Sequence, residues 1–172
     1  MGPAAARYGD GAPTGGLLRS ELMSDAAVST DPTSPGELPP GRTAPLDPDE
    51  AERHFREGIA LFNAARYWHA HESWETLWRA APEVERDFYQ GLIQVAAGLL
   101  HLKRRNLRGA RNKLAEGLAR LERYQPVHQG VLVNELLGKG GRVLDDLNAG
   151  ILPYLIPPVI RFVDSEEPDF SR

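Results

Sequence analysis

Two stretches of the chain, GIALFNAARYWHAHESWETLW at residues 58–78 and GLLHLKRRNLRGARNKLAEGL at residues 98–118, follow one pattern forty residues apart. Each begins with glycine, continues with apolar residues at helical spacing, and resumes a second apolar stripe after a short turn. Trp74 in the first stretch corresponds to Leu114 in the second. This pattern predicts two helical hairpins, each with a small residue where its helices cross closely. Because a solenoid usually needs about three repeats, a compact bundle is the expected architecture.

Residues that favour the beginnings and ends of helices support a helical bundle. Asp47 is a good N-cap and Pro48 suits the first helical position. Apolar periodicity and breakers predict helices at 48–64, 67–80, 84–104 and 107–124, then one or two short helices within 131–149. Glycines at 138, 140 and 141 leave the number of helices in the last segment open. We therefore expect an all-α fold: residues 47–150 form a compact bundle of about five helices built from two helical hairpins.

Both ends of the chain have compositions that oppose helix formation. Residues 1–46 hold seven of the fourteen prolines and seven of the seventeen glycines, so we expect a disordered Pro/Gly-rich N-terminal extension. Met23 is an alternative start, which would leave the first 22 residues untranslated. Residues 151–172 include ILPYLIPPVIRF, whose three prolines cannot continue a helix. We expect an extended Pro-rich C-terminal tail that lies over the core.

Composition narrows the classes of function. Apolar residues make up 41% of the 172 residues and charged residues 26%, as in a soluble globular protein. The formal net charge of −4 supplies no overall positive field for nucleic acid or anionic lipid. The chain has no cysteine, which excludes disulfides, thiolate-bound zinc and a thiol nucleophile. No apolar run approaches the roughly 20 residues needed to cross a bilayer, and no signal-peptide pattern opens the chain, so we expect a cytoplasmic protein.

Polar residues that should be carried toward the core lie on two predicted helices. In YWHAHESWETLW, His71 and Glu75 share an arc of about 80° with three large aromatic residues, which must be buried. The helix at 84–104 is apolar almost all round, and its polar stripe contains Asp87, Gln90, Gln94 and His101 beside two glycines. Plain solvent exposure is one interpretation. Glycines and amides favour the other, in which this stripe faces His71 and Glu75 in a semi-buried seam between the second and third helices.

The segments FNAARYWHAHESWETLWR and RDFYQGLIQVAAGLLHLKRRNLRGARNKL together resemble the domain of unknown function 309, a family of small helical proteins. The HE pair, the Glu and Trp after it, the R-D-x-x-Q-G-L-I-Q run and the N-x-x-G-A turn stand in the family's order, over roughly residues 50–148. Trp74 stands where a smaller aliphatic residue is expected. The resemblance implies an all-α bundle without an established activity. The shared face that it implies comprises His71, Glu72, Glu75, Trp78, Arg86, Asp87, Gln90, Gly91 and Gln94.

The favoured hypothesis is a non-catalytic bundle that binds a small molecule or a protein along this seam. The expected binding residues are His71, Glu72, Glu75, Trp78, Arg86, Asp87, Gln90, Gln94 and His101. A purely structural alternative stays open, in which the same groups satisfy one another's hydrogen bonds and fix the alignment of the helices.

Two chemical alternatives involve the HE pair. His71 and Glu75, four residues apart on a helix, could chelate a divalent metal with His101 as third ligand, in a metal-binding protein or a metal-dependent hydrolase. The zinc-peptidase pattern is incomplete, because Glu75 stands in place of its second histidine. Metal-free acid–base catalysis lacks a nearby nucleophile, so no catalytic residue is assigned.

A basic run, KRRNLRGARNK, carries six cationic residues from Lys103 to Lys113. Such a run can contact phosphates. No aromatic residue is interleaved in it and the whole chain is acidic, so solvated loop and helix faces explain it more simply. Nucleic acid is therefore not an expected partner, and homo-oligomerisation is left open.

Overall fold

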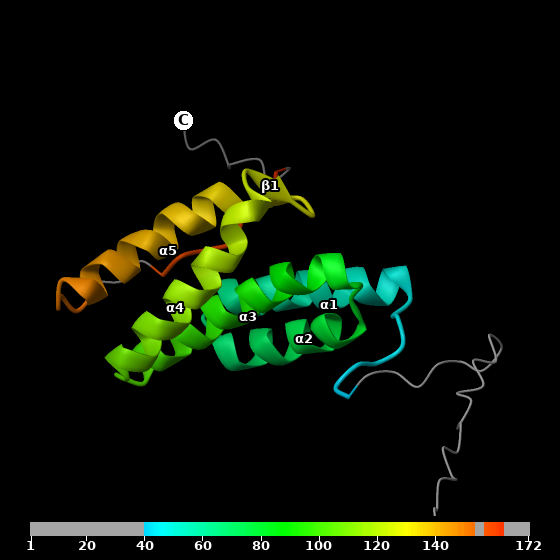
Figure 1. The fold of residues 1–172 in the computed structure, drawn as a ribbon, viewed down its shortest axis with the longest axis horizontal. Helices are drawn as coiled ribbons and strands as arrows, with labels where there is room; N and C mark the ends of the chain where they lie inside the picture. Colours follow the sequence, from blue (N-terminus) through cyan, green and yellow to red (C-terminus); the bar gives the residue numbers. More distant parts are fainter. Residues whose placement is uncertain (1–39, 154–156, 164–172) are drawn as a thin grey trace, which may run out of the picture. The chain divides into compact units, whose positions relative to one another are not determined.

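The computed structural model describes residues 40–153 and 157–163. Most of the predicted N-terminal extension, the alternative start at Met23 and parts of the predicted tail lie outside these ranges. The described chain contains five α-helices, one short 3-10 helix and one two-stranded hairpin (Figure 1), which confirms the predicted all-α bundle. Within the same ranges, no helix combines the length and the apolar character that crossing a membrane requires.

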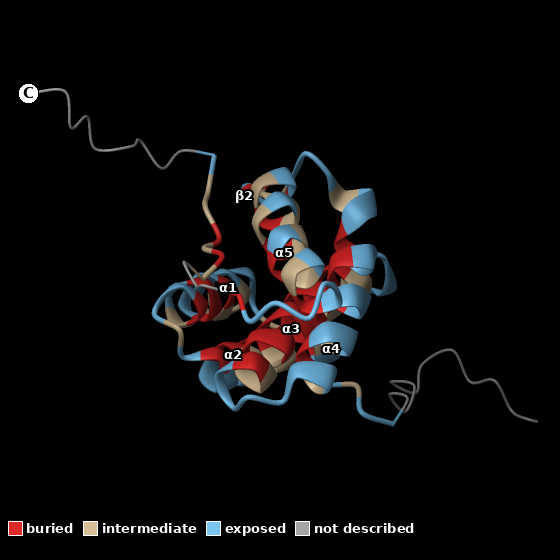
Figure 2. Cartoon of the chain, turned by 90° about the vertical axis from the view of Figure 1, so that its left-hand side faces the viewer, coloured by how far each residue is buried: buried red, intermediate tan, exposed pale blue. Residues whose placement is uncertain are grey.

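Two helical hairpins form the body of the bundle. Helices α1 (Pro48–Asn63) and α2 (Tyr67–Ala80) form the first, and α3 (Glu83–Lys103) and α4 (Leu107–Leu121) form the second. A 3-10 turn, Glu122–Tyr124, continues α4. Helix α3 packs against both α2 and α4 and is buried over most of its surface (Figure 2), as its nearly continuous apolar sequence predicts.

The turns of the two hairpins repeat one backbone geometry forty residues apart. Ala65 and Arg105 both adopt a left-handed conformation, with φ of 55° and 59°. In both turns the next residue's N–H donates to a carbonyl five residues earlier at 2.9 Å, which is the Schellman closure of a helix C-terminus. The internal repeat seen in the sequence therefore extends to the hydrogen bonds of the turns.

Both turns lie at the same end of the bundle. Lys103 Nζ donates to the Ala65 carbonyl at 3.4 Å, which links the α3–α4 turn to the α1–α2 turn. We call this region, residues 64–69 and 100–111, the turn end.

Each hairpin closes where a glycine on its first helix meets a large side chain on its second. A Cβ atom on Gly58 would overlap the indole of Trp74, which is fully buried. A Cβ atom on Gly98 would lie 2.7 Å from Leu114 Cγ, and Leu114 is also fully buried. The two contacts occupy equivalent positions in the repeat, so the small residue at each crossing has the role that the sequence predicts.

A β-hairpin and a fifth helix close the bundle over α4. The strands are β1 (Val127–His128) and β2 (Val131–Leu132), and α5 (Val133–Asn148) follows without a break. The three glycines at 138, 140 and 141 therefore do not divide this segment into two helices. Gly140 is instead a packing position, because a Cβ atom there would lie 2.7 Å from Leu118 Cδ2 on α4.

Side chains of α3 hold the β-hairpin in place. The Glu85 carboxylate lies 2.7 Å from His128 Nε2 and accepts a hydrogen bond from Gln129 Nε2 at 2.8 Å. The Tyr89 hydroxyl donates to Gln129 Oε1 at 3.0 Å, and burial raises the pKa of this phenol. The loop that follows α4 is therefore fixed to the start of α3.

The described part of the C-terminal segment, residues 157–163, is not helical and lies against α1 and β2. Asn63 bonds the backbone of Ile160 twice, at 2.9 Å to its carbonyl and 2.8 Å from its N–H. Phe162 pairs with Val131 in an isolated antiparallel bridge.

Alanine at two glycines should separate close packing from helix propensity. We expect Gly58→Ala to lower the free energy of unfolding by about 1–3 kcal/mol, because the new methyl group collides with Trp74 in a filled core. Gly138→Ala should raise it by about 0.5–1 kcal/mol, because this position is exposed within a continuous helix and nothing lies within 4 Å of the added atom. Urea unfolding of both variants measures the effects. A loss of stability in Gly138→Ala would contradict the continuous α5.

Candidate functional site

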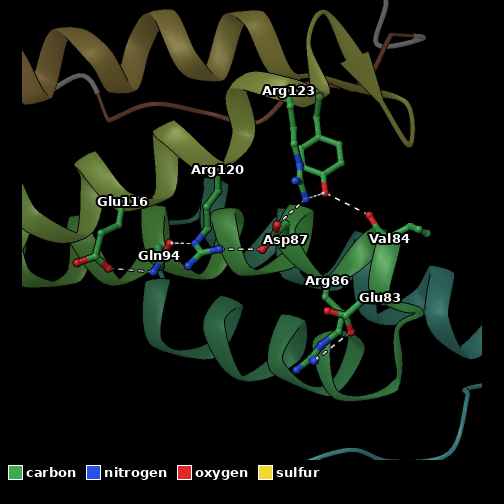
Figure 3. A network of polar contacts seen from close by, with 9 residues as sticks. Glu83, Val84, Arg86, Asp87, Gln94, Glu116, Arg120 and Arg123 are labelled. Atoms are coloured by element: carbon green, nitrogen blue, oxygen red, sulfur yellow. Dashed lines mark hydrogen bonds and ion pairs between the residues drawn. The ribbon is translucent and has the colours of Figure 1, made fainter.

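Polar side chains of α3 and α4 form a network between these two helices (Figure 3). Asp87 accepts from Arg120 Nη1 at 2.8 Å and from Arg123 Nη2 at 2.5 Å. Gln94 bridges the same helices, since its Nε2 donates to Glu116 at 2.9 Å and its Oε1 accepts from Arg120 Nε at 3.0 Å. Asp87 and Gln94 are thus engaged with α4 and do not face α2.

The predicted seam between the second and third helices is therefore wrong for these two residues. The physical reason is the pair of glycines on the same stripe of α3. Cβ atoms at Gly91 and Gly98 would lie 2.8 Å and 2.7 Å from leucine side chains of α4, so these glycines admit α4 rather than α2. The amide and carboxylate beside them are consequently carried into the α3–α4 contact.

His71 and Glu75 lie along the edge of α2, where both side chains are half-buried. His71 Nδ1 is 3.8 Å from a Glu75 oxygen, and Glu75 also accepts a 2.6 Å hydrogen bond from Arg79. The Trp68 ring stacks on His71 with 5.7 Å between centroids. Glu72, the other member of the motif, is exposed. The pair therefore belongs to an ion-pair ladder on one helix, beside the core and not within it.

Trp78 of α2 and Arg86 of α3, two residues of the predicted seam, do contact each other. The Arg86 guanidinium lies over the Trp78 ring at 4.3 Å, a cation–π contact, and its Nη1 is 3.4 Å from Glu83. Gln90, one turn further along α3, is half-buried and its side chain makes no hydrogen bond within the described residues.

The three predicted metal ligands are not brought together. His101 lies at the turn end, with Nδ1 3.1 Å from Asn106 Nδ2 and its ring against Gly109. His71 and Glu75 remain on α2, and no group of three or more His, Cys, Asp or Glu side chains within the described ranges is arranged to hold a metal ion. The expected site of His71, Glu75 and His101 is thus corrected to a histidine–carboxylate pair and a separate histidine.

A cavity of about 350 Å³ opens at the turn end, away from the predicted seam. It is lined by the α1–α2 turn, the first turn of α2 and the last turn of α3. The lining residues are Ala65, Arg66, Tyr67, Trp68, His69, Leu100, Lys103 and Arg104. Its volume falls in the range of small-ligand sites, and the lining combines three cationic side chains with two aromatic ones and no carboxylate.

The two aromatic residues of this cavity differ in their accessibility. Tyr67 is buried, and this burial raises the pKa of its phenol. Trp68 is 49% exposed, an unusual state for a tryptophan, with one face of the ring stacked on His71. A planar group entering the cavity would therefore meet an aromatic surface beside positive charge.

Sequence reasoning missed this cavity, although the repeat contained the signal. Ala65 and Arg105 occupy equivalent positions in the forty-residue repeat, one in each hairpin turn. The aromatic residues that begin α2 and the basic residues that end α3 therefore lie beside two neighbouring turns. Within the sequence itself, the run from Lys103 to Lys113 has no aromatic residue beside it.

Residues 55–112, about a third of the chain, match the family model described as Domain of unknown function (DUF309). The matched segment runs from α1 through α2 and α3 into α4, and the resemblance predicted from the sequence is confirmed over it. A comparison with curated proteins finds no match. The family's description assigns no activity, so function has to be argued from the site.

Two amides of α3 provide a matched test of the polar network. We expect Gln94→Ala to lower the free energy of unfolding by about 1–2 kcal/mol, because Gln94 is buried and bonded to both Glu116 and Arg120. Gln90→Ala, with the same change of side chain at a half-buried position without a hydrogen bond, should stay within about 0.5 kcal/mol of wild type. Equal effects in chemical denaturation would show that the bridge to α4 contributes little.

Proposed function

We propose that this bundle is a non-catalytic binding protein whose ligand is a small anion with a planar group, held in the turn-end cavity. The observation that supports this proposal is the composition of the lining: Arg66, Lys103 and Arg104 surround a cavity of about 350 Å³ that contains no carboxylate. In a chain of net charge −4, such a concentration of unopposed positive charge favours an anionic ligand.

The planar group is inferred from the aromatic part of the lining. Trp68 keeps half of its surface accessible while its ring is held against His71. A ring held in place loses little entropy when a ligand stacks on it, and stacking contributes affinity beyond the buried area. An anion with an aromatic or conjugated portion therefore complements the cavity better than a simple inorganic ion.

Binding is better supported than catalysis at this place. His69 is the one histidine of the lining, and no carboxylate lines the cavity to orient it as a general base. Arginine side chains are permanently protonated, so they hold an anion but do not exchange protons with it.

A fluorescent anion tests the proposal directly. We expect 1-anilinonaphthalene-8-sulfonate to bind the full-length protein at one saturable site at low salt. The double variant Arg66→Glu, Arg104→Glu should weaken its affinity by about tenfold or more, equivalent to about 1.4 kcal/mol. Fluorescence titration gives both affinities.

The control for this experiment is the double variant Arg53→Glu, Arg142→Glu. It changes the net charge by the same amount at exposed positions on α1 and α5, outside the cavity. Unchanged circular dichroism must accompany each variant. Absence of saturable binding, or the same loss of affinity in both double variants, would disprove the proposal.

A further inference from the structure

Arginines without an acidic partner are concentrated at the turn end. Within the described ranges, most arginines of the bundle lie within 4 Å of a carboxylate, as do Arg53, Arg79 and Arg120. The six that have no such partner are Arg66, Arg104, Arg105, Arg108, Arg111 and Arg142. Five of these six belong to the turn end, and only Arg142 lies elsewhere, on α5. This end of an acidic protein is therefore locally and strongly basic.

The placement of two of these arginines opposes helix stability. Arg66 is the N-cap of α2 and Arg108 lies in the first turn of α4, where the helix dipole is positive and repels cations. Neither helix has an acidic residue in its first turn. By contrast α1 and α3, which begin at the opposite end, both carry two acidic residues there. Residues that violate a local rule without structural compensation are characteristic of functional surfaces.

The arginines extend well beyond the cavity. Arg104 lines it, Arg105 forms the tip of the α3–α4 turn, and Arg108 and Arg111 follow on α4. The last two are three residues apart, so they are neighbours on the helix surface. A small ligand in the cavity cannot contact this whole strip, which indicates a longer anion.

The fold also supplies the aromatic element that the basic run lacks in sequence. Trp68 and Tyr67 come from the first hairpin and line the same cavity as Lys103 and Arg104 of the second. In the sequence, no aromatic residue is interleaved with the basic run from Lys103 to Lys113. In the folded protein, aromatic and basic residues share one surface.

We propose that the turn end binds single-stranded nucleic acid, with one base stacked on Trp68 in the cavity and the backbone phosphates along Arg104, Arg105, Arg108 and Arg111. This inference rests on the proposed function, because it identifies the planar anion of the cavity as one nucleotide of a longer strand. Arginine outnumbers lysine on this surface, and its planar fork suits phosphate. A single strand is required because a base must be unstacked to reach a tryptophan.

Fluorescence anisotropy with a labelled twelve-nucleotide oligothymidylate tests the proposal. Contact with about four phosphates predicts that the logarithm of the association constant falls with the logarithm of salt concentration at a slope of about −3. Trp68→Ala should weaken binding roughly tenfold without changing this slope, since the lost interaction is stacking.

A triple variant distinguishes binding of the nucleic-acid strand from binding of a small anion in the cavity. Arg105→Glu, Arg108→Glu and Arg111→Glu together should weaken oligothymidylate binding by more than about tenfold and flatten the salt slope. These positions lie outside the cavity lining, so binding of 1-anilinonaphthalene-8-sulfonate should persist. Arg108→Glu alone should raise the midpoint of thermal unfolding, because it places a carboxylate in the first turn of α4. A loss of strand binding in that variant would then not arise from unfolding.

The control triple variant, Arg53→Glu, Arg56→Glu, Arg142→Glu, changes the net charge equally and should retain strand binding. Weakening equal to that of the turn-end triple would overturn the proposal, as would a Trp68→Ala variant that binds like wild type. So would equal binding of a duplex of the same length or of phosphatidylserine vesicles. If the strand does not bind while the fluorescent sulfonate does, this inference is wrong and the proposed function stands. If neither ligand binds, both are wrong.

Discussion

The close approach of a glycine on one helix to a large apolar side chain on the next determines how both hairpins pack. Trp74 fills the space above Gly58, and Leu114 fills the equivalent space above Gly98. Any side chain at either glycine would force the helices apart and open a gap in a core packed at crystalline density. The repeated turns, the central position of α3 and the direction of its polar stripe all depend on these two crossings.

Because Gly98 and Gly91 direct α3 toward α4, the polar residues on the same stripe act within that hairpin. Gln94 lies at the centre of the contact, where its amide satisfies both a carboxylate and a guanidinium. Asp87 lies nearer the surface and pairs with Arg120 of α4 and Arg123 of the 3-10 turn that follows it. A buried amide must be hydrogen-bonded, whereas exposed ion pairs contribute little to stability. The network therefore stabilises the fold mainly through the hydrogen bonds of Gln94. The contact between α3 and α4 therefore accounts for the polar residues of this network.

The repeat has an electrostatic consequence at the turn end. Two hairpins in the same orientation bring both turns, two helix N-termini and the basic end of α3 to one place. Acidic residues lie in the first turns of α1 and α3 at the opposite end, so charge is unevenly distributed along the bundle although the total is only −4. Local fields of this kind attract a ligand independently of net charge. Trp68 adds an accessible aromatic surface beside these positive charges.

The helices, their pairing into hairpins and the fold class follow from the sequence, because apolar periodicity and turn signals act over a few residues. It also placed Trp74 in the core and a glycine at each crossing. The partner of each polar face, by contrast, depends on how the helices pack in three dimensions. Asp87 and Gln94 could equally have faced α2, and His101 could have joined His71, because helical spacing gives a residue's direction but not which neighbour lies there. For the same reason, the cavity could not be predicted from the sequence. Trp68 and Arg104 come from different hairpins, and their proximity depends on how the hairpins pack.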